Sequence, residues 1–134
     1  MIAAEREDHP VLKQGEEGVA HGMRSLFLLD DAGNCRPGMG CDGRPCPMGA
    51  EPELAALVEK KRVFSSVVTR EEAIQAALEV AAIEGFLPGE NSAYAVAEAL
   101  KASQDYALDE NIVVILSGKA DKNWIETCMR KKVE

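Results

Sequence analysis

Long apolar runs and clustered basic residues are both scarce in this chain of 134 residues, and each scarcity excludes a class of protein. No apolar run approaches the ~20 residues that a membrane-spanning helix needs, so we expect no membrane segment. The start, "MIAAEREDHP", has neither a basic region nor a long apolar stretch, so we expect no secretory signal and a cytoplasmic location. The net charge of −8 argues against general nucleic-acid binding, because the only dense basic run is Arg130-Lys131-Lys132.

What the sequence does contain is the balance of a soluble globular domain. Apolar residues make up 46% of the chain and charged residues 28%. A chain of this length buries about two-thirds of its unfolded surface, which is enough for a hydrophobic core. The sequence therefore predicts a single unit that spans residues 1–134.

The four cysteines do not form a recognisable metal motif. Cys35, Cys41 and Cys46 crowd into "CRPGMGCDGRPC", whereas Cys128 lies far along the chain. Structural zinc sites need four ligands and pair them two to four residues apart, and these three cysteines are separated by five and four residues. We assign no metal site and expect reduced thiols.

Apolar spacing and turn residues divide the chain into alternating strands and helices. The order predicts an α/β fold with a mostly parallel sheet flanked by helices. The expected elements are a connection at 5–18, a strand at 25–29, an irregular loop or disordered segment at 35–52, a helix at 53–62, a strand at 63–68, helices at 70–84 and from Asn91 or Ser92 onward, a strand at 112–116 and a helix at 121–131.

The helix at 70–84 has the clearest local signals. Thr69 and Glu72 form a Thr-x-x-Glu capping box, and Gly85 stands where a C-terminal cap belongs. Small apolar residues recur at helical spacing on this helix and on the next, which predicts close packing of both against a sheet. These residues are Ile74, Ala77, Leu78 and Ala81, followed by Ala93, Val96, Ala97 and Leu100.

Ser117 and Gly118 follow the continuously apolar run 112–116, whose composition is typical of a strand covered on both faces. In open α/β sheets ligands bind at the carboxyl ends of strands, where backbone amides and helix amino termini are exposed. A serine hydroxyl there suits a phosphate, a carboxylate or a heterocyclic nitrogen. Ser-Gly is also an ordinary way to turn a corner and cap a helix. No Ser-His-Asp set is identifiable, since both histidines lie in the amino-terminal quarter.

Several collinear segments resemble one family, the tryptophan synthase β subunit. "GVAHGMRSLFLLDDAGN" is similar to the family's Gly-Val-x-His-Gly-Met-Arg/Lys segment, and "VVTREEAIQA" to its Val-Ser-x-Thr-Asp-Asp-Glu-Ala-Leu-Glu-Ala. "EGFLPGENSAYAVAEALK" resembles Glu-Gly-Ile-Ile-Pro-Ala-Leu-Glu-Ser-Ala-His-Ala-Leu-Ala-x-Ala-Leu-Lys, and "IVVILSGKADKN" resembles Ile-Ile-Val-x-Leu-Ser-Gly-Arg-Gly-Asp-Lys-Asp. The resemblance corresponds to about the last third of that family's sequence.

The resemblance implies a fold-type II enzyme that uses pyridoxal phosphate (PLP). Ser117 would hydrogen-bond the pyridine nitrogen, Gly118 would let the ring approach closely, and Asn91 with Glu90 would lie beside it. The family's glutamate aligns with Asn91, because Glu90 is shifted by one position, and Lys119 replaces an arginine. The Cys/Gly/Pro segment at 35–52 replaces the family's Ser-x-Ser-Ala-Gly-Leu-Asp-Tyr-Pro-Gly-Val-Gly-Pro run.

The resemblance also says what this chain does not carry. The family's Schiff-base lysine and its Gly-rich phosphate loop both lie upstream of the matching part, and Lys13, Lys60 and Lys119 stand in no matching motif. We therefore expect no catalytic residue in the chain and no activity from it alone. In the complete enzyme the reaction would be β-replacement of L-serine with indole, and an amino-terminal partner or missing segment is implied.

Two hypotheses remain open at this point. The chain is a carboxyl-terminal segment of such a PLP-dependent lyase, or it is a stand-alone binding or interaction module derived from the same fold. The first predicts exposed apolar surface and self-association, including a homo-oligomer, and the second predicts a monomer that melts sharply.

Overall fold

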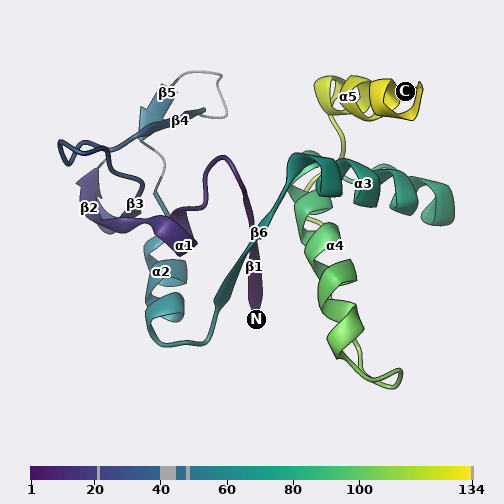
Figure 1. The fold of residues 1–134 in the computed structure, drawn as a ribbon, viewed down its shortest axis with the longest axis horizontal. Helices are drawn as coiled ribbons and strands as arrows, with labels where there is room; N and C mark the ends of the chain where they lie inside the picture. Colours follow the sequence, from purple (N-terminus) through teal and green to yellow (C-terminus); the bar gives the residue numbers. More distant parts are fainter. Residues whose placement is uncertain (21, 40–44, 48, 134) are drawn as a thin grey trace. The chain divides into compact units, whose positions relative to one another are not determined.

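The computed structural model describes residues 1–20, 22–39, 45–47 and 49–133 (Figure 1). The chain divides into two compact units, Met1–Val67 and Val68–Glu134. Each unit is described by itself below. That residues 1–134 form one α/β unit stays a prediction.

Strands β1 (Ile2–Arg6) and β6 (Phe64–Val68) form a two-stranded sheet in which both strands run in the same direction (Figure 1). The hydrogen bonds of Met1 show the parallel pattern. Its amino group donates to the carbonyl of Arg62 at 3.3 Å, and its carbonyl accepts from the N–H of Phe64 at 3.0 Å. The predicted strand at 63–68 is thereby confirmed.

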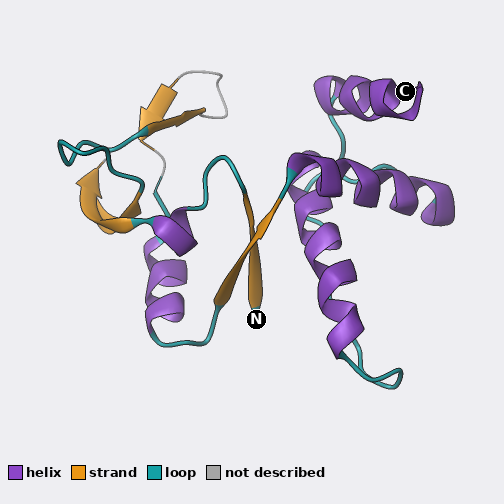
Figure 2. Ribbon diagram, in the orientation of Figure 1, coloured by secondary structure: helices purple, strands orange, loops and turns teal. Residues whose placement is uncertain are grey.

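The rest of the first unit contains two antiparallel hairpins and two helices (Figure 2). Strand β2 (Glu16–Ala20) pairs with β3 (Met23–Phe27), and β4 (Pro37–Met39) pairs with β5 (Pro45–Pro47). Helix α1 (Val11–Gln14) precedes β2. Helix α2 (Pro52–Glu59) packs on β3, around a core that includes Val11, Phe27, Ala50 and Val63.

These hairpins correct two predictions. The connection expected at 5–18 contains α1 and the start of β2, and the segment 35–52, expected to be irregular, contains β4 and β5. Polar and Gly/Pro-rich sequence argues against a central strand, but a short strand of a two-stranded hairpin leaves one edge free and so tolerates proline. The strand expected at 25–29 is confirmed as β3, two residues earlier. Cys41 lies outside the described residues.

The second unit consists of helices α3 (Arg70–Glu84), α4 (Glu90–Ala102) and α5 (Lys122–Val133), with a 3₁₀ turn, η1, at Ser103–Asp105. The predicted capping box of α3 is present. The N–H of Glu72 donates to Thr69 Oγ1 at 3.2 Å, and the N–H of Thr69 donates to Glu72 Oε2 at 2.7 Å. Gly85 ends the helix at φ 75°, a left-handed conformation that favours glycine.

Helices α3 and α4 pack on one another rather than on a sheet, which corrects the prediction for their small apolar faces. Four of the predicted residues are buried: Ile74, Ala77, Ala93 and Ala97. Alanine side chains let two helices approach closely, so the small apolar faces of α3 and α4 bury one another. Leu100, which was expected in the same stripe, is 47% exposed.

The strand predicted at 112–116 is wrong for the described chain, because these residues form neither a helix nor a strand. Val113 is 88% exposed and Ile115 is 75% exposed. A strand exists only where a neighbouring backbone completes its hydrogen bonds, and no described segment pairs with this one.

The α/β class predicted from the sequence is confirmed, with a parallel sheet of two strands and flanking helices. The sheets are small, and the two antiparallel pairs were not anticipated. Within the described residues no helix is long and apolar enough to cross a membrane.

Candidate functional site

The corner at Ser117-Gly118-Lys119 lies against the amino terminus of α4. The N–H of Gly89 donates to the carbonyl of Gly118 at 3.0 Å. The hydroxyl of Ser92 lies 3.3 Å from both the N–H and the carbonyl oxygen of Gly118. An isolated β-bridge between Pro88 and Lys119 continues the contact. The structure thus joins the 117–119 corner to the helix that begins with Glu90 and Asn91.

Gly89 makes this close approach possible. A Cβ atom at this position would lie 2.9 Å from the carbonyl oxygens of both Gly118 and Lys119, which is closer than real Cβ contacts. At Gly118 an added Cβ would meet nothing within 4 Å. The two glycines therefore differ, since Gly89 is required by packing and Gly118 faces open space.

The four residues that the sequence singled out lie near this contact with different exposures. Ser117, Gly118 and Asn91 are exposed, and Glu90 is half-buried at the first position of α4. The amino terminus of a helix presents unpaired N–H groups and a partial positive charge. Exposed polar groups beside that terminus offer a hydroxyl, an amide and backbone N–H groups to a ligand.

Glu90 is held by an arginine from the neighbouring helix. Its Oε1 lies 3.4 Å from a guanidinium nitrogen of Arg70, the first residue of α3. The same guanidinium lies 5.9 Å from the ring centre of Trp124, within the range of a cation–π contact. This arrangement ties the starts of α3 and α4 to α5.

Trp124 contacts the corner through Pro88. It is 2% exposed, and its indole Nε1–H donates to the carbonyl of Pro88 at 3.0 Å. Pro88 in turn pairs with Lys119. No role for Trp124, Arg70 or Ser92 was predicted from the sequence. The signal that was available is that Trp124 is the only tryptophan of the chain, in a helix directly after the Ser-Gly corner.

Cys128 is buried one helical turn beyond Trp124, with 1% of its surface exposed. Burial raises the pKa of its thiol, the carboxylate of Glu90 raises that pKa further, and Arg70 opposes the increase. The thiol is therefore protonated at neutral pH. Because the thiolate is the nucleophile, Cys128 fits a packing role rather than a chemical one.

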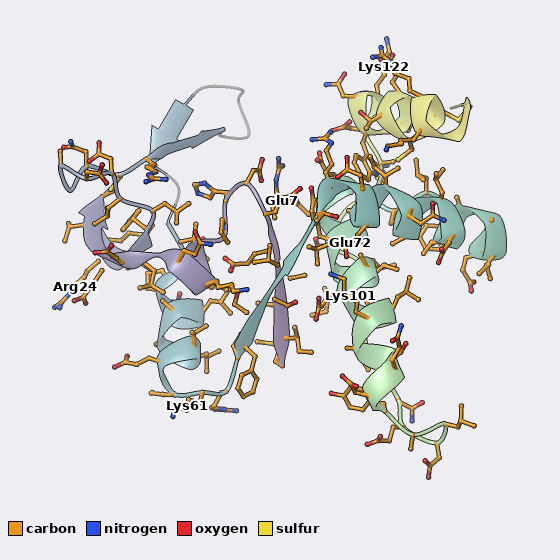
Figure 3. The ribbon with its side chains drawn as sticks, viewed as in Figure 1. Glu7, Arg24, Lys61, Glu72, Lys101 and Lys122 are labelled. Carbon is orange, nitrogen blue, oxygen red and sulfur yellow. The ribbon has the colours of Figure 1, made fainter. Side chains whose placement is uncertain are left out.

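A second ion pair connects α3 and α4 away from the corner. Lys101 Nζ lies 2.9 Å from Glu72 Oε1, and the two side chains face each other in Figure 3. The hydrogen bond from Lys101, together with the backbone N–H of Thr69, lowers the pKa of Glu72 from 4.5 to about 2. Glu72 is therefore both a helix cap and an ionised partner of Lys101 at neutral pH.

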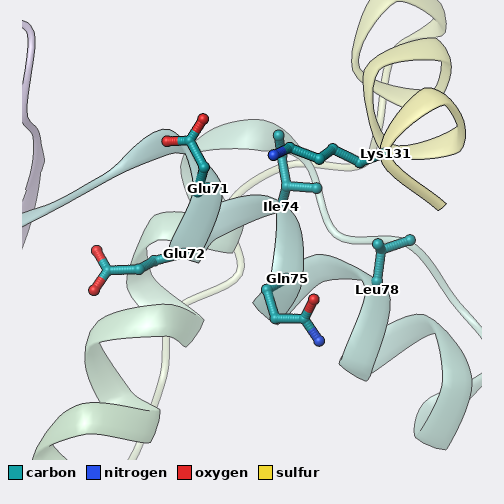
Figure 4. Close-up of a pocket in the computed structure, with 6 residues that line it drawn as sticks. All are labelled: Glu71, Glu72, Ile74, Gln75, Leu78 and Lys131. Carbon is teal, nitrogen blue, oxygen red and sulfur yellow. The ribbon is translucent and has the colours of Figure 1, made fainter. Parts of the chain in front are cut away.

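The surface of α3 also carries a shallow hollow beside α5 (Figure 4). Lys131 reaches over it from α5, and the other lining residues come from α3: Glu71, Glu72, Ile74, Gln75 and Leu78. In the first unit another hollow lies between the β2–β3 hairpin and α2. Neither hollow is lined by Ser117, Gly118, Asn91 or Glu90, so neither adds to the candidate site.

The exposed groups at the corner are of the kinds that one edge of a PLP ring would need. Ser117 is exposed at the corner, and its neutral hydroxyl is a group that can donate a hydrogen bond to a pyridine nitrogen. The backbone at Gly118 is open on its Cβ side, since an added Cβ would meet nothing within 4 Å. No three His, Cys, Asp or Glu side chains in the described ranges gather as they would around a metal ion.

Comparison with known proteins identifies the relatives of this chain. No family model matches it. The tryptophan synthase beta chain 1 of Methanosarcina acetivorans is 38% identical over 115 residues, which cover 86% of this chain and 28% of that protein. The tryptophan synthase beta chain of Leptospira biflexa is 32% identical over 120 residues, which cover 90% of this chain and 30% of that protein. The resemblance predicted from the sequence is confirmed: this chain is similar to tryptophan synthase beta chains and spans about three-tenths of the length of the relatives it matches.

Proposed function

We propose that the chain is the carboxyl-terminal segment of a tryptophan synthase β-like, PLP-dependent lyase. The complete form would replace the hydroxyl of L-serine with indole, in the cytoplasm. The observation that carries the proposal is the coverage: similarity extends over 86% to 90% of this chain but over only 28% to 30% of its relatives. The missing part would supply the Schiff-base lysine and the phosphate loop.

Within the complete enzyme this chain would bind one edge of the cofactor. When bound, PLP supplies an electron sink for carbanion chemistry. The hydroxyl of Ser117 would hydrogen-bond the pyridine nitrogen, and Gly118 would let the ring approach the backbone. Asn91 and Glu90 would lie at the ring's flank. A neutral serine, unlike a carboxylate, does not stabilise a protonated pyridinium, so the ring nitrogen would stay unprotonated.

The position of the Glu90 carboxylate supports a site that differs from that of the family, in which a glutamate stands where this chain has Asn91. Glu90 is engaged by Arg70, and the exposed position beside it is Asn91, which has no charge. The edge of the ring next to α4 would therefore meet an amide rather than a free carboxylate. On the side of the ring next to α4, Ser117 would then be the group that influences how strongly the ring withdraws electrons.

The first test is spectroscopic and uses the chain alone. PLP and then L-serine are added to the purified protein, and absorption is recorded against the same mixture without protein. We expect no band that depends on a lysine of the chain. The variants Lys13→Ala, Lys60→Ala and Lys119→Ala are the matched set, and a band that one of them abolishes would contradict the proposal.

The second test asks for activity after completion. The chain is co-expressed with the part of the Methanosarcina acetivorans relative that lies outside the match, and formation of tryptophan from L-serine and indole is followed. We expect activity only with both parts, and a loss of about fivefold or more for Ser117→Ala, because a hydrogen bond to the ring contributes on the order of 1 kcal/mol or more. Ser103→Ala, which changes an exposed serine at the far end of α4, is the control.

A further inference from the structure

The start of α4 carries half of a charge pair that the family motifs lack. The motif that "TREEA" resembles, Thr-Asp-Asp-Glu-Ala, has an aspartate at the position of Arg70. The motif that "PGENSA" resembles, Pro-Ala-Leu-Glu-Ser-Ala, has a leucine at the position of Glu90 and a glutamate at that of Asn91. An aspartate and a leucine cannot form an ion pair, so the cation and its carboxylate occur together in this chain.

The guanidinium of Arg70 contacts an aromatic ring and a carboxylate at once. It lies 5.9 Å from the ring centre of Trp124, and one of its nitrogens lies 3.4 Å from Glu90 Oε1. Trp124 is 2% exposed and donates to the carbonyl of Pro88, so its ring offers the cation a fixed surface. The position of the guanidinium is therefore set by α5 as well as by its own helix, α3.

The carboxylate of Glu90 is directed into the packing of the helices. Its Oε1 atom is buried. Among the influences on the pKa of the Cys128 thiol, burial comes first, but the Glu90 carboxylate also raises that pKa and Arg70 lowers it. Charges act on each other in this way only at short distance, so both groups lie close to the buried face of α5. A carboxylate in such a place is unfavourable without its cation, and Arg70 supplies it.

Asp121, the carboxylate nearest the corner in sequence, is engaged as well. Its Oδ1 accepts from the N–H of Trp124 at 2.8 Å, the pattern of a cap at the start of α5. The exposed side chains at the corner are then neutral or positive, because Ser117 and Asn91 carry no charge and Lys119 is a cation. The arrangement keeps two neighbouring carboxylates occupied elsewhere.

We propose that Arg70 is a positioning residue of the candidate site, which holds the Glu90 carboxylate toward α3 and α5 and leaves the amide of Asn91 at the corner. Without Arg70 the carboxylate would turn to water, and the amino terminus of α4, which attracts negative charge, would keep it beside the corner. A carboxylate there would favour a protonated pyridine nitrogen, whereas the neutral corner favours a ring edge that accepts hydrogen bonds. In its meaning for a PLP ring, the inference rests on the proposed function.

The experiment is a double-mutant cycle on the chain alone, in which Cys128 senses where the carboxylate lies. The pKa of its thiol is measured from the ¹³Cβ chemical shift of labelled cysteine, assigned with Cys128→Ser. We expect Glu90→Gln to lower this pKa, because it removes the carboxylate. In Arg70→Met, which keeps an apolar stem against Trp124, the carboxylate has already moved. Glu90→Gln should then have less than about half of its effect.

Three further variants separate charge from fold. Arg70→Lys keeps a cation and should retain most of the effect of Glu90→Gln. Arg70→Gln, which is neutral and polar, should behave like Arg70→Met. Glu84→Gln makes the same chemical change at the other end of α3, about 21 Å from Arg70 along the helix, and should leave the thiol pKa unchanged. The side chain of Arg70 is 45% exposed, so we expect its variants to stay folded, which circular dichroism checks.

The cycle and the completed enzyme give separate answers. An undiminished effect of Glu90→Gln in Arg70→Met would overturn the inference, because another group would then hold the carboxylate. Absence of any effect of Glu90→Gln in the unaltered chain would overturn it too. In the completed enzyme, Arg70→Met should change the pH profile of kcat, and adding Glu90→Gln should restore it. An unchanged profile would refute the role at the ring. The expected cycle in a chain whose completed form makes no tryptophan would support the role of Arg70 while the proposed function fails.

Discussion

Helices α3 and α4 find their packing partners inside the chain, whereas the apolar residues 112–116 that follow them do not. The alanine faces of the two helices bury one another, and Thr69, Glu72 and Gly85 cap α3 from its own sequence. Val113 and Ile115 stay in contact with water. The difference shows that a helix satisfies its backbone within itself, while a strand depends on a neighbour that can belong to another chain.

The 117–119 corner joins the packed helices to the exposed segment 112–116. It directly follows the uncovered segment, yet Gly118 is bonded to Gly89 and Ser92 of the helical region. Trp124 supports the same region from below through Pro88. The candidate site therefore lies on the packed helical part of the second unit and adjoins the apolar residues 112–116, which the described chain leaves exposed.

The largest effect should come from removing the support of the packed helical part. Trp124→Ala deletes a side chain that is 2% exposed and should lower the free energy of unfolding of the second unit by about 3–5 kcal/mol. Trp124→Phe keeps most of the apolar contact but leaves the carbonyl of Pro88 without its donor, and should cost about 1–2 kcal/mol. Urea denaturation followed by circular dichroism measures both. Equal stability of the alanine variant and the unaltered chain would refute the role of Trp124 as a support.

A glycine pair tests the close approach at the corner itself. Gly89→Ala places a Cβ against two carbonyl oxygens and should destabilise the corner by about 1–3 kcal/mol. Gly118→Ala meets nothing within 4 Å and is the matched control, with an expected change under about 0.5 kcal/mol. Hydrogen exchange of the amides at 117–119 reports the loss locally. If both substitutions had the same effect, the contact between Gly89 and Gly118 would not be what holds the corner.

The ion pair of Glu72 gives a smaller, pH-dependent effect. Its pKa falls from 4.5 to about 2 on folding, so the ionised carboxylate stabilises the folded chain fully above pH 4.5 and this contribution is lost as the pH falls toward 2. The pair with Lys101 is exposed, so we expect only about 0.5 kcal/mol from it at neutral pH. The difference in melting temperature between the unaltered chain and Glu72→Gln should be largest at pH 6 and vanish near pH 2. Glu71→Gln, one residue away and outside this ion pair, is the matched control, and a Glu72→Gln difference that grew on acidification would contradict the account.

The smallest effect is expected in the exposed segment 112–116. Val113→Lys/Ile115→Lys changes two exposed side chains and should alter the free energy of unfolding of the isolated chain by less than about 0.5 kcal/mol. The same urea titration measures it. A loss of several kcal/mol would mean that the segment is part of the chain's own core, and the contrast with α3 and α4 would be lost.

Local signals in the sequence were sufficient for most of the helices. Thr69 with Glu72 predicted the start of α3 and Gly85 its end, because capping involves residues three or four positions apart. The same holds for the start of α4 after Pro88-Gly89, which lies within two residues of the prediction. These elements need no information from distant parts of the chain.

Contacts between distant residues were not predictable in this way. The bond of Trp124 to Pro88 joins residues 36 positions apart, and that of Ser92 to Gly118 joins residues 26 apart. The apolar run 112–116 was predicted to be a strand covered on both faces, which is wrong for the described chain, because composition alone does not show whether neighbouring strands exist to pair with it. The roles of Ser117, Gly118, Asn91 and Glu90 came from the family resemblance and stay predictions.

The most direct test of the central claim is the native DNA sequence immediately upstream of the codon for Met1. The account predicts an in-frame extension that encodes a Schiff-base lysine motif and a Gly-rich phosphate loop, which together with this chain would complete a tryptophan synthase β-like enzyme. A stop codon followed by an unrelated gene would contradict it, and would favour a stand-alone module in which Ser117 only turns a corner.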